Sequence, residues 1–443
     1  MKAEDIVEFA VKKAKSAGAT DAVSQVRETD WAMIRFTNNG VTVSKVLKDT
    51  SVEIFLFVKE KRAGSSVSNL SEKAIEKAVL DAAKMARMSP AGGTYAPLPK
   101  GRFRYNKKLL RIGKAAGKIE RLPGLVKESI DSAKATGASR VAGSLVAETR
   151  RVVQRSSTGI KGSYKTTSYN LNVRAFADGE CTGQFAIIAN DIDEVNGGEI
   201  GRVAGDIAKR ALHPEQAQPG TYDVVLGPMT TADIIEEMAG ASSAFYVDAG
   251  MSFFTDKLGA ALAPSHLCLV DDPTDPSNPG ACPFDDEGVP TQANRILSSG
   301  KLETYLHNST TAAKMKTRTT ANAGLVIPKP FSLQVSAGTG TIEDLVSKVD
   351  DGLYVTNNWY LRYQNMRSGD FSTILRDGLF RVKGGQIVGP VRGLRLTDNL
   401  VKMLGNIEAT SSKRYWIKWW EVDTPVLAPA MLVRGVRFTK PTI

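Results

Sequence analysis

Histidine is scarce in this chain of 443 residues, which contains only three. They are His213, His266 and His307, and no two of them lie within ten positions of each other. The chain therefore has neither an HExxH helix nor a closely spaced histidine pair, which are the usual local signatures of a zinc site. A histidine-rich metal centre would have to be assembled from distant parts of the chain.

Cysteine and long apolar runs are also scarce. Cys181, Cys268 and Cys282 are too few and too scattered for a disulfide framework, and they suit a reducing compartment. No run of 18 apolar residues occurs, so no membrane span is predicted and no membrane is expected as a partner. The opening MKAEDIVEFAVKKAKSAG carries acidic residues where a signal peptide would be apolar. Cytoplasm is the simplest location for such a chain.

Positive charge is in excess, because 58 lysines and arginines outnumber 47 aspartates and glutamates and give a formal net charge of +11. Such an excess is typical of proteins that bind nucleic acids. However, the most concentrated basic stretch, residues 100–118, offers only Phe103 and Tyr105 for stacking on bases. A solvated linker is the simpler interpretation of this stretch, so nucleic acid is not expected to be a partner.

The first part of the chain alternates between helix and strand patterns. Residues 4–17 carry an apolar stripe with helical spacing, which predicts an amphipathic helix. Residues 20–67 change to short strand-like runs, and Asn39-Gly40 between apolar runs predicts a two-residue hairpin. Ser71 is a suitable N-cap for a second helix. The order of this unit is therefore helix, antiparallel strands, helix.

The same pattern recurs at a constant shift of 119 residues. Gly18-Ala19 after the first helix matches Gly137-Ala138, and Gly40 in the hairpin matches Gly159. A helix, a stop, a turn and strands that match under one offset predict a duplicated unit.

These patterns predict an α+β fold, in which an N-terminal domain of duplicated helix–antiparallel-strands–helix units precedes a β-rich C-terminal domain. The N-terminal domain is expected to span residues 1–218, with repeats at 1–90 and about 119–213 joined by a basic linker at 91–118. The C-terminal domain is expected to span residues 219–443.

An acidic segment between residues 271 and 291 is the most unusual local feature of the second half. Its carboxylates could hold a hard cation such as calcium or magnesium, although the spacing is not that of a helix-loop-helix calcium site. An ordered loop whose aspartates accept backbone N–H bonds is the simpler alternative. Asp285, Asp286 and Glu287 are candidates for contact with a peptide or an interface.

Aromatic residues gather near the C-terminus in a strand-like run that includes Trp416, Trp419 and Trp420. Such side chains can stack on bases or line a peptide groove. Packing in a core or at a subunit interface is the simpler interpretation, and the three tryptophans are kept as peptide or interface candidates.

Several longer motifs carry a family resemblance that covers nearly the whole chain. They are FDDEGVPT (284–291), YLHNSTTAAKM (305–315), TRTTANAG (317–324), SGDFS (368–372) and IVGPVRGLRLTDNLVKMLGNI (387–407). In this order they resemble the TldD/PmbA family of metallopeptidases, also known as modulators of DNA gyrase.

The resemblance also locates a degenerate metal motif. TldD-type members of the family carry an HExxxH helix and a C-terminal cysteine as metal ligands. Alignment of the helix places Glu236 at the first histidine, Glu237 at the glutamate and Ala241 at the second histidine, and no cysteine follows Cys282. The resemblance therefore implies a metal-free, TldE/PmbA-type subunit with no cofactor of its own. Glu236 and Glu237 are expected to lie on a solvated helix face.

The resemblance further implies a heterodimer with a TldD-type subunit that carries zinc. Such a pair cleaves unfolded peptides inside an enclosed chamber, with the peptide held as an added β-strand. This chain would close the chamber and would be inactive alone, so whether it counts as an enzyme stays open. Two alternatives are a nucleic-acid or gyrase-associated binding protein and a homodimeric scaffold without protease activity.

Overall fold

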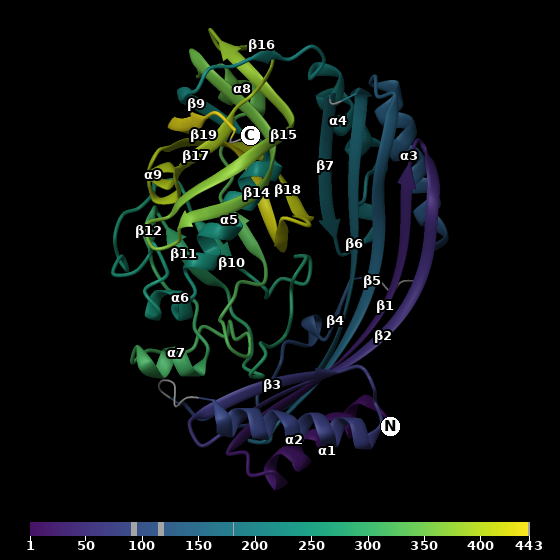
Figure 1. The fold of residues 1–443 in the computed structure, drawn as a ribbon, viewed down its shortest axis with the longest axis vertical. Coiled ribbons are helices and arrows are strands. Elements are labelled where there is room, and N and C mark those ends of the chain that lie inside the picture. Colours follow the sequence, from purple (N-terminus) through teal and green to yellow (C-terminus); the bar gives the residue numbers. More distant parts are fainter. Residues whose placement is uncertain (90–94, 114–118, 180, 442–443) are drawn as a thin grey trace.

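The computed structural model describes residues 1–89, 95–113, 119–179 and 181–441. These residues form a mixed α+β fold with two sheets, and the C-terminal part is rich in strands (Figure 1). Parts of the predicted basic linker, 91–94 and 114–118, lie outside the described residues.

The helices and strands of the described residues have the following bounds. The helices are α1 (Ala3–Ser16), α2 (Glu72–Met88), α3 (Leu122–Ala135), α4 (Gly197–Arg210), α5 (Pro228–Ala241), α6 (Ala244–Asp248), α7 (Ser309–Lys314), α8 (Ile342–Val346) and α9 (Leu400–Gly405). The strands of the first sheet are β1 (Asp21–Thr37), β2 (Gly40–Val58), β3 (Lys61–Val67), β4 (Arg111–Ile112), β5 (Arg140–Ser156), β6 (Lys161–Asp178) and β7 (Cys181–Ala189). Those of the second sheet are β8 (Glu215–Gln216), β9 (Gly220–Leu226), β10 (Leu269–Asp271), β11 (Asn294–Ser298), β12 (Lys301–Leu302), β13 (Leu333–Val335), β14 (Asp351–Asn365), β15 (Asp370–Lys383), β16 (Gln386–Arg392), β17 (Arg395–Asn399), β18 (Ile407–Trp419) and β19 (Val422–Thr439).

The first sheet is built from long antiparallel strands in the order β3-β2-β1-β5-β6, and β7 and the short β4 both pair with β6. The predicted hairpin is present, but its two turn residues are Asn38 and Asn39 instead of Asn39 and Gly40, because Gly40 already pairs with Thr37 as the first residue of β2. Asn38 and Asn39 both have positive φ, 51° and 67°, as the turn between twisted strands requires.

Helices cover the two ends of this sheet (Figure 1). α1 and α2 pack on β1, β2 and β3 at one end, whereas α3 and α4 pack on β5, β6 and β7 at the other. The predicted cap of the second helix is confirmed, since the Ser71 hydroxyl accepts the Ala74 N–H at 3.3 Å. The segments before and after residue 119 thus share one order of elements, which is helix, three long strands, helix.

α4 packs against α3 so closely that the backbones of the two helices are in contact. Its facing residues are Gly197, Gly201 and Gly205, which recur every four residues on one side of the helix. A Cβ atom placed on Gly201 would lie only 2.0 Å from the Ser129 carbonyl oxygen of α3. The two helices can approach this closely only because all three positions lack a side chain.

Five strands of the second sheet form a closed ring. β9 pairs with β14, β14 with β15, β15 with β17, β17 with β19, and β19 returns to β9. The closing contact places Leu396 of β17 opposite Phe438 of β19. Closure leaves these five strands with few unpaired edges, and β18 adds to the ring by pairing with β19.

α5 follows β9 directly and packs against β14, β18 and β19. Eleven of its 14 residues are buried, so it is covered on nearly all sides rather than along one stripe. No helix within the described ranges is both long enough and apolar enough to cross a membrane.

The second sheet lies on the concave side of the long first-sheet strands (Figure 1). The two sheets are joined by specific polar contacts. Arg174 of β6, for example, forms an ion pair with the buried Asp377 of β15 at 2.8 Å. Asn170 of β6 also donates to the Lys418 carbonyl oxygen of β18 at 2.7 Å. A continuous apolar cluster extends from α3 and α4 into the second sheet.

Candidate functional site

The carboxylates of α5 differ in their exposure to water. Asp233 is 1% exposed, Glu236 and Glu237 are half-buried, and burial raises the pKa of all three above their ordinary values. The expected solvated face for Glu236 and Glu237 is therefore partly covered by other segments of the chain. The cover comes from β14 and from the turn between β18 and β19, which contact α5 from distant parts of the chain.

Glu236 binds the start of β19. Its Oε2 atom accepts the Asp423 N–H at 3.0 Å, and its Oε1 atom accepts the Thr424 N–H. Burial raises the pKa of Glu236 to about 7 and outweighs these backbone bonds, which favour the charged form. Glu236 is therefore a structural carboxyl group that is partly protonated near neutral pH.

Glu237 lies on the same helix beside Tyr363 and Arg362 of β14. Burial raises its pKa, while the Tyr363 hydroxyl bond and the Arg362 charge oppose that rise. Glu421 adds negative charge nearby and accepts the Tyr360 N–H at 2.9 Å. The result is a group of acids held by a tyrosine, an arginine and the backbone.

Asp233 is the most deeply buried acid of the group. Burial holds its pKa well above the usual range, although the Asn358 amide donates to its carboxyl group. The same amide donates to the Thr373 hydroxyl at 3.0 Å. Burial in this environment therefore favours the neutral form of the Asp233 carboxyl group.

These side chains do not fit a zinc ion. Zinc sites combine histidine or cysteine ligands with an occasional carboxylate, whereas this helix offers carboxylates alone. Glu236 is already bound to two backbone N–H groups, burial favours the neutral form of Asp233, and Ala241 is apolar and 5% exposed. Within the part of the chain that the structure describes, no group of three His, Cys, Asp or Glu residues could hold a metal ion.

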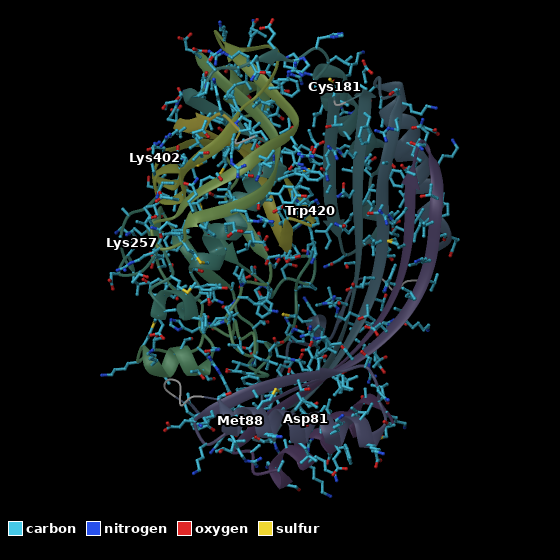
Figure 2. All side chains as sticks on the ribbon, in the orientation of Figure 1. Asp81, Met88, Cys181, Lys257, Lys402 and Trp420 are labelled. Carbon is cyan, nitrogen blue, oxygen red and sulfur yellow. The ribbon has the colours of Figure 1, made fainter. Side chains whose placement is uncertain are left out.

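An aromatic cluster covers this end of α5. Trp419 is 4% exposed and Trp420 is 48% exposed, and their rings lie 5.8 Å and 5.2 Å from that of Trp359. Figure 2 shows Trp420 on the side of the C-terminal strands that faces the first sheet. Trp416 is half-buried on β18, opposite Leu427 of β19. Only Trp420 of the three predicted tryptophans offers a large exposed surface.

The acidic loop is held together by its own carboxylates. Asp285 accepts the N–H groups of Glu287, Val289 and Ala323 at 2.9–3.0 Å. Glu287 accepts the N–H and the hydroxyl of Ser309, at the start of α7. Burial raises the pKa of both acids, and the two charges repel each other. Both carboxylates are thus used in folding the loop.

Asp286 points the other way, toward the first sheet. It accepts a hydrogen bond from Gln25 at 3.1 Å, and Arg27 lies 3.8 Å from it. It lines a cavity of about 420 Å³ between the two sheets, together with Arg150, Lys329, Lys418, Asp423 and Thr424 among others. This inter-sheet groove therefore reaches the backbone that Glu236 holds.

The structure brings some of the predicted residues together and separates others. Asp286 lines the inter-sheet groove, and Glu236 is bonded to Asp423 and Thr424, which line it too, whereas Asp285 and Glu287 lie within the loop. Asp233 was not among the predicted residues, although it lies one helical turn before Glu237 on the same side of the helix. Its partner Asn358 is 125 positions away and carries no local signal.

A family model for the PmbA/TldA metallopeptidase C-terminal domain matches residues 219–440. A metalloprotease from Synechocystis sp. is 29% identical over 221 residues, which cover 48% of this chain and 47% of that relative. The chain spans about half the length of several curated relatives that it matches. A metalloprotease PmbA homolog from Haemophilus influenzae is 24% identical over 430 residues, covering 91% of this chain and 90% of the relative.

Solved structures share the fold over nearly the whole chain. A Thermotoga maritima protein, described as a modulator of a DNA gyrase, has a TM-score of 0.83 at 21% identity and covers 98% of this chain and 100% of its own. TldE from Thermococcus kodakarensis has a TM-score of 0.82 at 17% identity with the same coverage. Because the family model matches half of the chain, this chain belongs to the PmbA/TldD metallopeptidase family.

Proposed function

We propose that this chain is the non-catalytic, TldE/PmbA-like subunit of a two-subunit zinc metalloprotease that degrades or processes unfolded peptides. The TldD-type partner would carry the zinc and the hydrolytic chemistry, and this chain would close the chamber around it. The full-length similarity to a PmbA homolog supports this assignment, and the fold shared with TldE is consistent with it.

One observation carries the proposal. Both carboxylate oxygens of Glu236, at the position of the first metal ligand, accept backbone N–H bonds from Asp423 and Thr424. A catalytic zinc site needs three protein ligands and an open position for water. A glutamate bound to the start of a core strand instead makes α5 a structural helix.

The inter-sheet groove is proposed as the part of the chamber that this subunit supplies. It is bounded by strand faces of the first sheet and by loops of the second, with Asp286 and Lys418 on its walls. An unfolded peptide can bind such a surface in extended form, through its backbone. Trp420 and Tyr360, both partly exposed, would offer apolar contacts to the same segment.

The proposal includes the domain layout and the location. Division into residues 1–218 and 219–443 is supported by the family model, which describes a C-terminal domain that starts at 219. Duplication of the N-terminal unit is supported by the shared order of elements, with α1 beginning at Ala3 and α3 at Leu122. A cytoplasmic location is supported by three free cysteines.

The test is to purify the chain alone, its TldD-type partner alone, and the two together, and to assay each with an unfolded peptide and with zinc or a chelator. Zinc-dependent cleavage is expected only when the partner is present, and the mixture should elute as a complex on gel filtration. Zinc-dependent cleavage by this chain alone would contradict the proposal.

Nucleic-acid binding is not favoured by the basic stretch. Tyr105, one of its two aromatic residues, packs against Phe284 at 4.8 Å and donates to the Gly288 carbonyl oxygen at 2.9 Å. A stable homodimer that never binds a TldD-type protein would instead support the scaffold alternative.

A further inference from the structure

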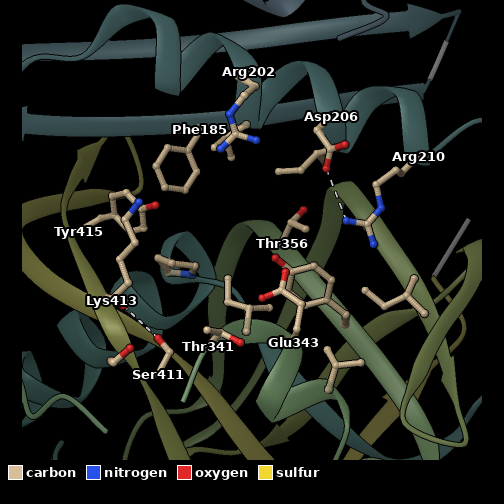
Figure 3. A pocket seen from close by; sticks show the side chains of 18 of the residues that line it. Phe185, Arg202, Asp206, Arg210, Thr341, Glu343, Thr356, Ser411, Lys413 and Tyr415 are labelled. Carbon is tan, nitrogen blue, oxygen red and sulfur yellow. Dashed lines mark hydrogen bonds and ion pairs between the residues drawn. The ribbon is translucent and has the colours of Figure 1, made fainter. Parts of the chain in front are cut away.

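A second cavity, of about 620 Å³, lies between α4 of the first sheet and the closed ring of the second (Figure 3). On α5 it reaches only Pro228, about two helical turns before Glu236, so it is distinct from the inter-sheet groove. Its size is that of a typical small-molecule site, roughly 300–1,000 Å³.

The walls of this cavity are mixed, with an apolar part formed by α4, α8 and β14. Val203 and Ile207 project from α4, Ile342 and Val346 from α8, and Tyr354 from β14. Such walls favour a ligand with an apolar side chain, because its transfer out of water is favourable.

Most charged groups at the cavity are already paired. Lys413 binds Glu199 at 2.6 Å, and Arg210 binds Asp206 at 3.4 Å. Within each pair the positive and negative charges cancel, so these four side chains attract a charged ligand only weakly.

Arg202 and Glu343 are different. Arg202 lies on α4, and Glu343 lies on α8 across the cavity, as Figure 3 shows. Among the described residues neither side chain has an ion pair or a hydrogen bond, and the acid that Arg202 influences, Glu199, is already bound by Lys413 and Tyr415. The cavity therefore presents one available positive and one available negative group on opposite walls.

We infer that this cavity binds a short zwitterionic peptide with an apolar side chain, whose separated termini can reach opposite walls. Its carboxylate pairs with Arg202, its ammonium group pairs with Glu343, and its side chain enters the apolar space between α4 and α8. Because the walls come from both sheets, the bound ligand bridges the two halves of the protein. This inference does not rest on the proposed protease role.

The test is isothermal titration calorimetry of the full chain with the dipeptide leucyl-leucine, its N-acetyl form and its C-terminal amide. Saturable binding of the free dipeptide is expected, and each cap should weaken it by about fivefold, which is the effect of one exposed ion pair. Arg202→Gln should bind the free peptide and the amide equally, while Glu343→Gln should bind the free peptide and the acetylated form equally.

Lys209→Gln is the matched control. Lys209 lies on α4 near Arg202, but its side chain contacts the Gly137 region instead of the cavity. It should bind the three ligands as the unchanged chain does. Absence of saturable binding at millimolar dipeptide, equal binding of free and capped forms, or a preference for the free carboxylate that persists in Arg202→Gln would each overturn the inference. If a variant does not fold, the affinities of the unchanged chain for the free and the capped dipeptides still test the inference.

Discussion

Replacing Glu236 by glutamine tests whether this carboxyl group is a buried structural acid. Its pKa in the folded protein is about 7, against an ordinary value of 4.5. Between these two pH values the folded protein holds a proton that the unfolded chain releases. Stability is therefore highest at low pH and falls as pH rises through 7, by about 3 kcal/mol in total.

The Glu236→Gln variant cannot ionise, so it should not show that fall. Its amide offers one good acceptor instead of two, which leaves one of the Asp423 and Thr424 N–H groups unpaired. That loss costs about 1–3 kcal/mol at every pH. The variant should be less stable than the unchanged chain at about pH 5, and the difference should shrink or reverse by about pH 8.

The assay is urea unfolding at a series of pH values, followed by tryptophan fluorescence. Four of the five tryptophans lie in the C-terminal half, and Trp419 and Trp420 sit beside the turn that Glu236 holds. Glu303→Gln removes the same charge at an exposed position and is the control. Parallel pH profiles for the unchanged chain and Glu236→Gln would refute the reasoning.

Three further substitutions test other contacts. Asp285→Ala removes the acceptor of three backbone N–H groups, so it should cost more than about 3 kcal/mol and make residues 271–291 sensitive to limited proteolysis. Gly201→Ala should lower stability by about 1–3 kcal/mol in thermal unfolding, because its Cβ would meet the α3 backbone; an unchanged melting temperature would contradict that close contact. Tyr363→Phe removes a hydroxyl donor from Glu237 and should cost about 2 kcal/mol when the carboxylate is charged and less when it is protonated, so the loss should grow with pH in urea unfolding at a series of pH values.

Local features of the fold were predictable because their causes lie within a few residues. The Ser71 cap bonds to Ala74 three residues later, and the hairpin between β1 and β2 needs only two residues with suitable backbone freedom, here Asn38 and Asn39. The helix that carries Glu236 and Glu237 was also expected, and it corresponds to α5.

The closed ring and the cover over α5 were not predictable in the same way. The local sequence pattern of neither strand indicates that Leu396 pairs with Phe438. Two adjacent glutamates on a helix normally indicate a solvated face. Glu236 departs from that rule because its partner Asp423 is 187 positions away, and only the folded chain brings the two together.

The position of β19 has a consequence for synthesis of the protein on the ribosome. This last strand, Val422–Thr439, pairs with β9, β13, β17 and β18, so it connects most of the second sheet. The first sheet and its helices are complete once residue 210 has been made, whereas the ring stays open until the final strand emerges. While the second half is being made, the nascent chain thus carries a finished first half and an incomplete second sheet, which is a state that chaperones protect. A premature stop before residue 422 would leave β9 and β13 without their shared neighbour, so loss of β19 should remove the whole second half from the folded population.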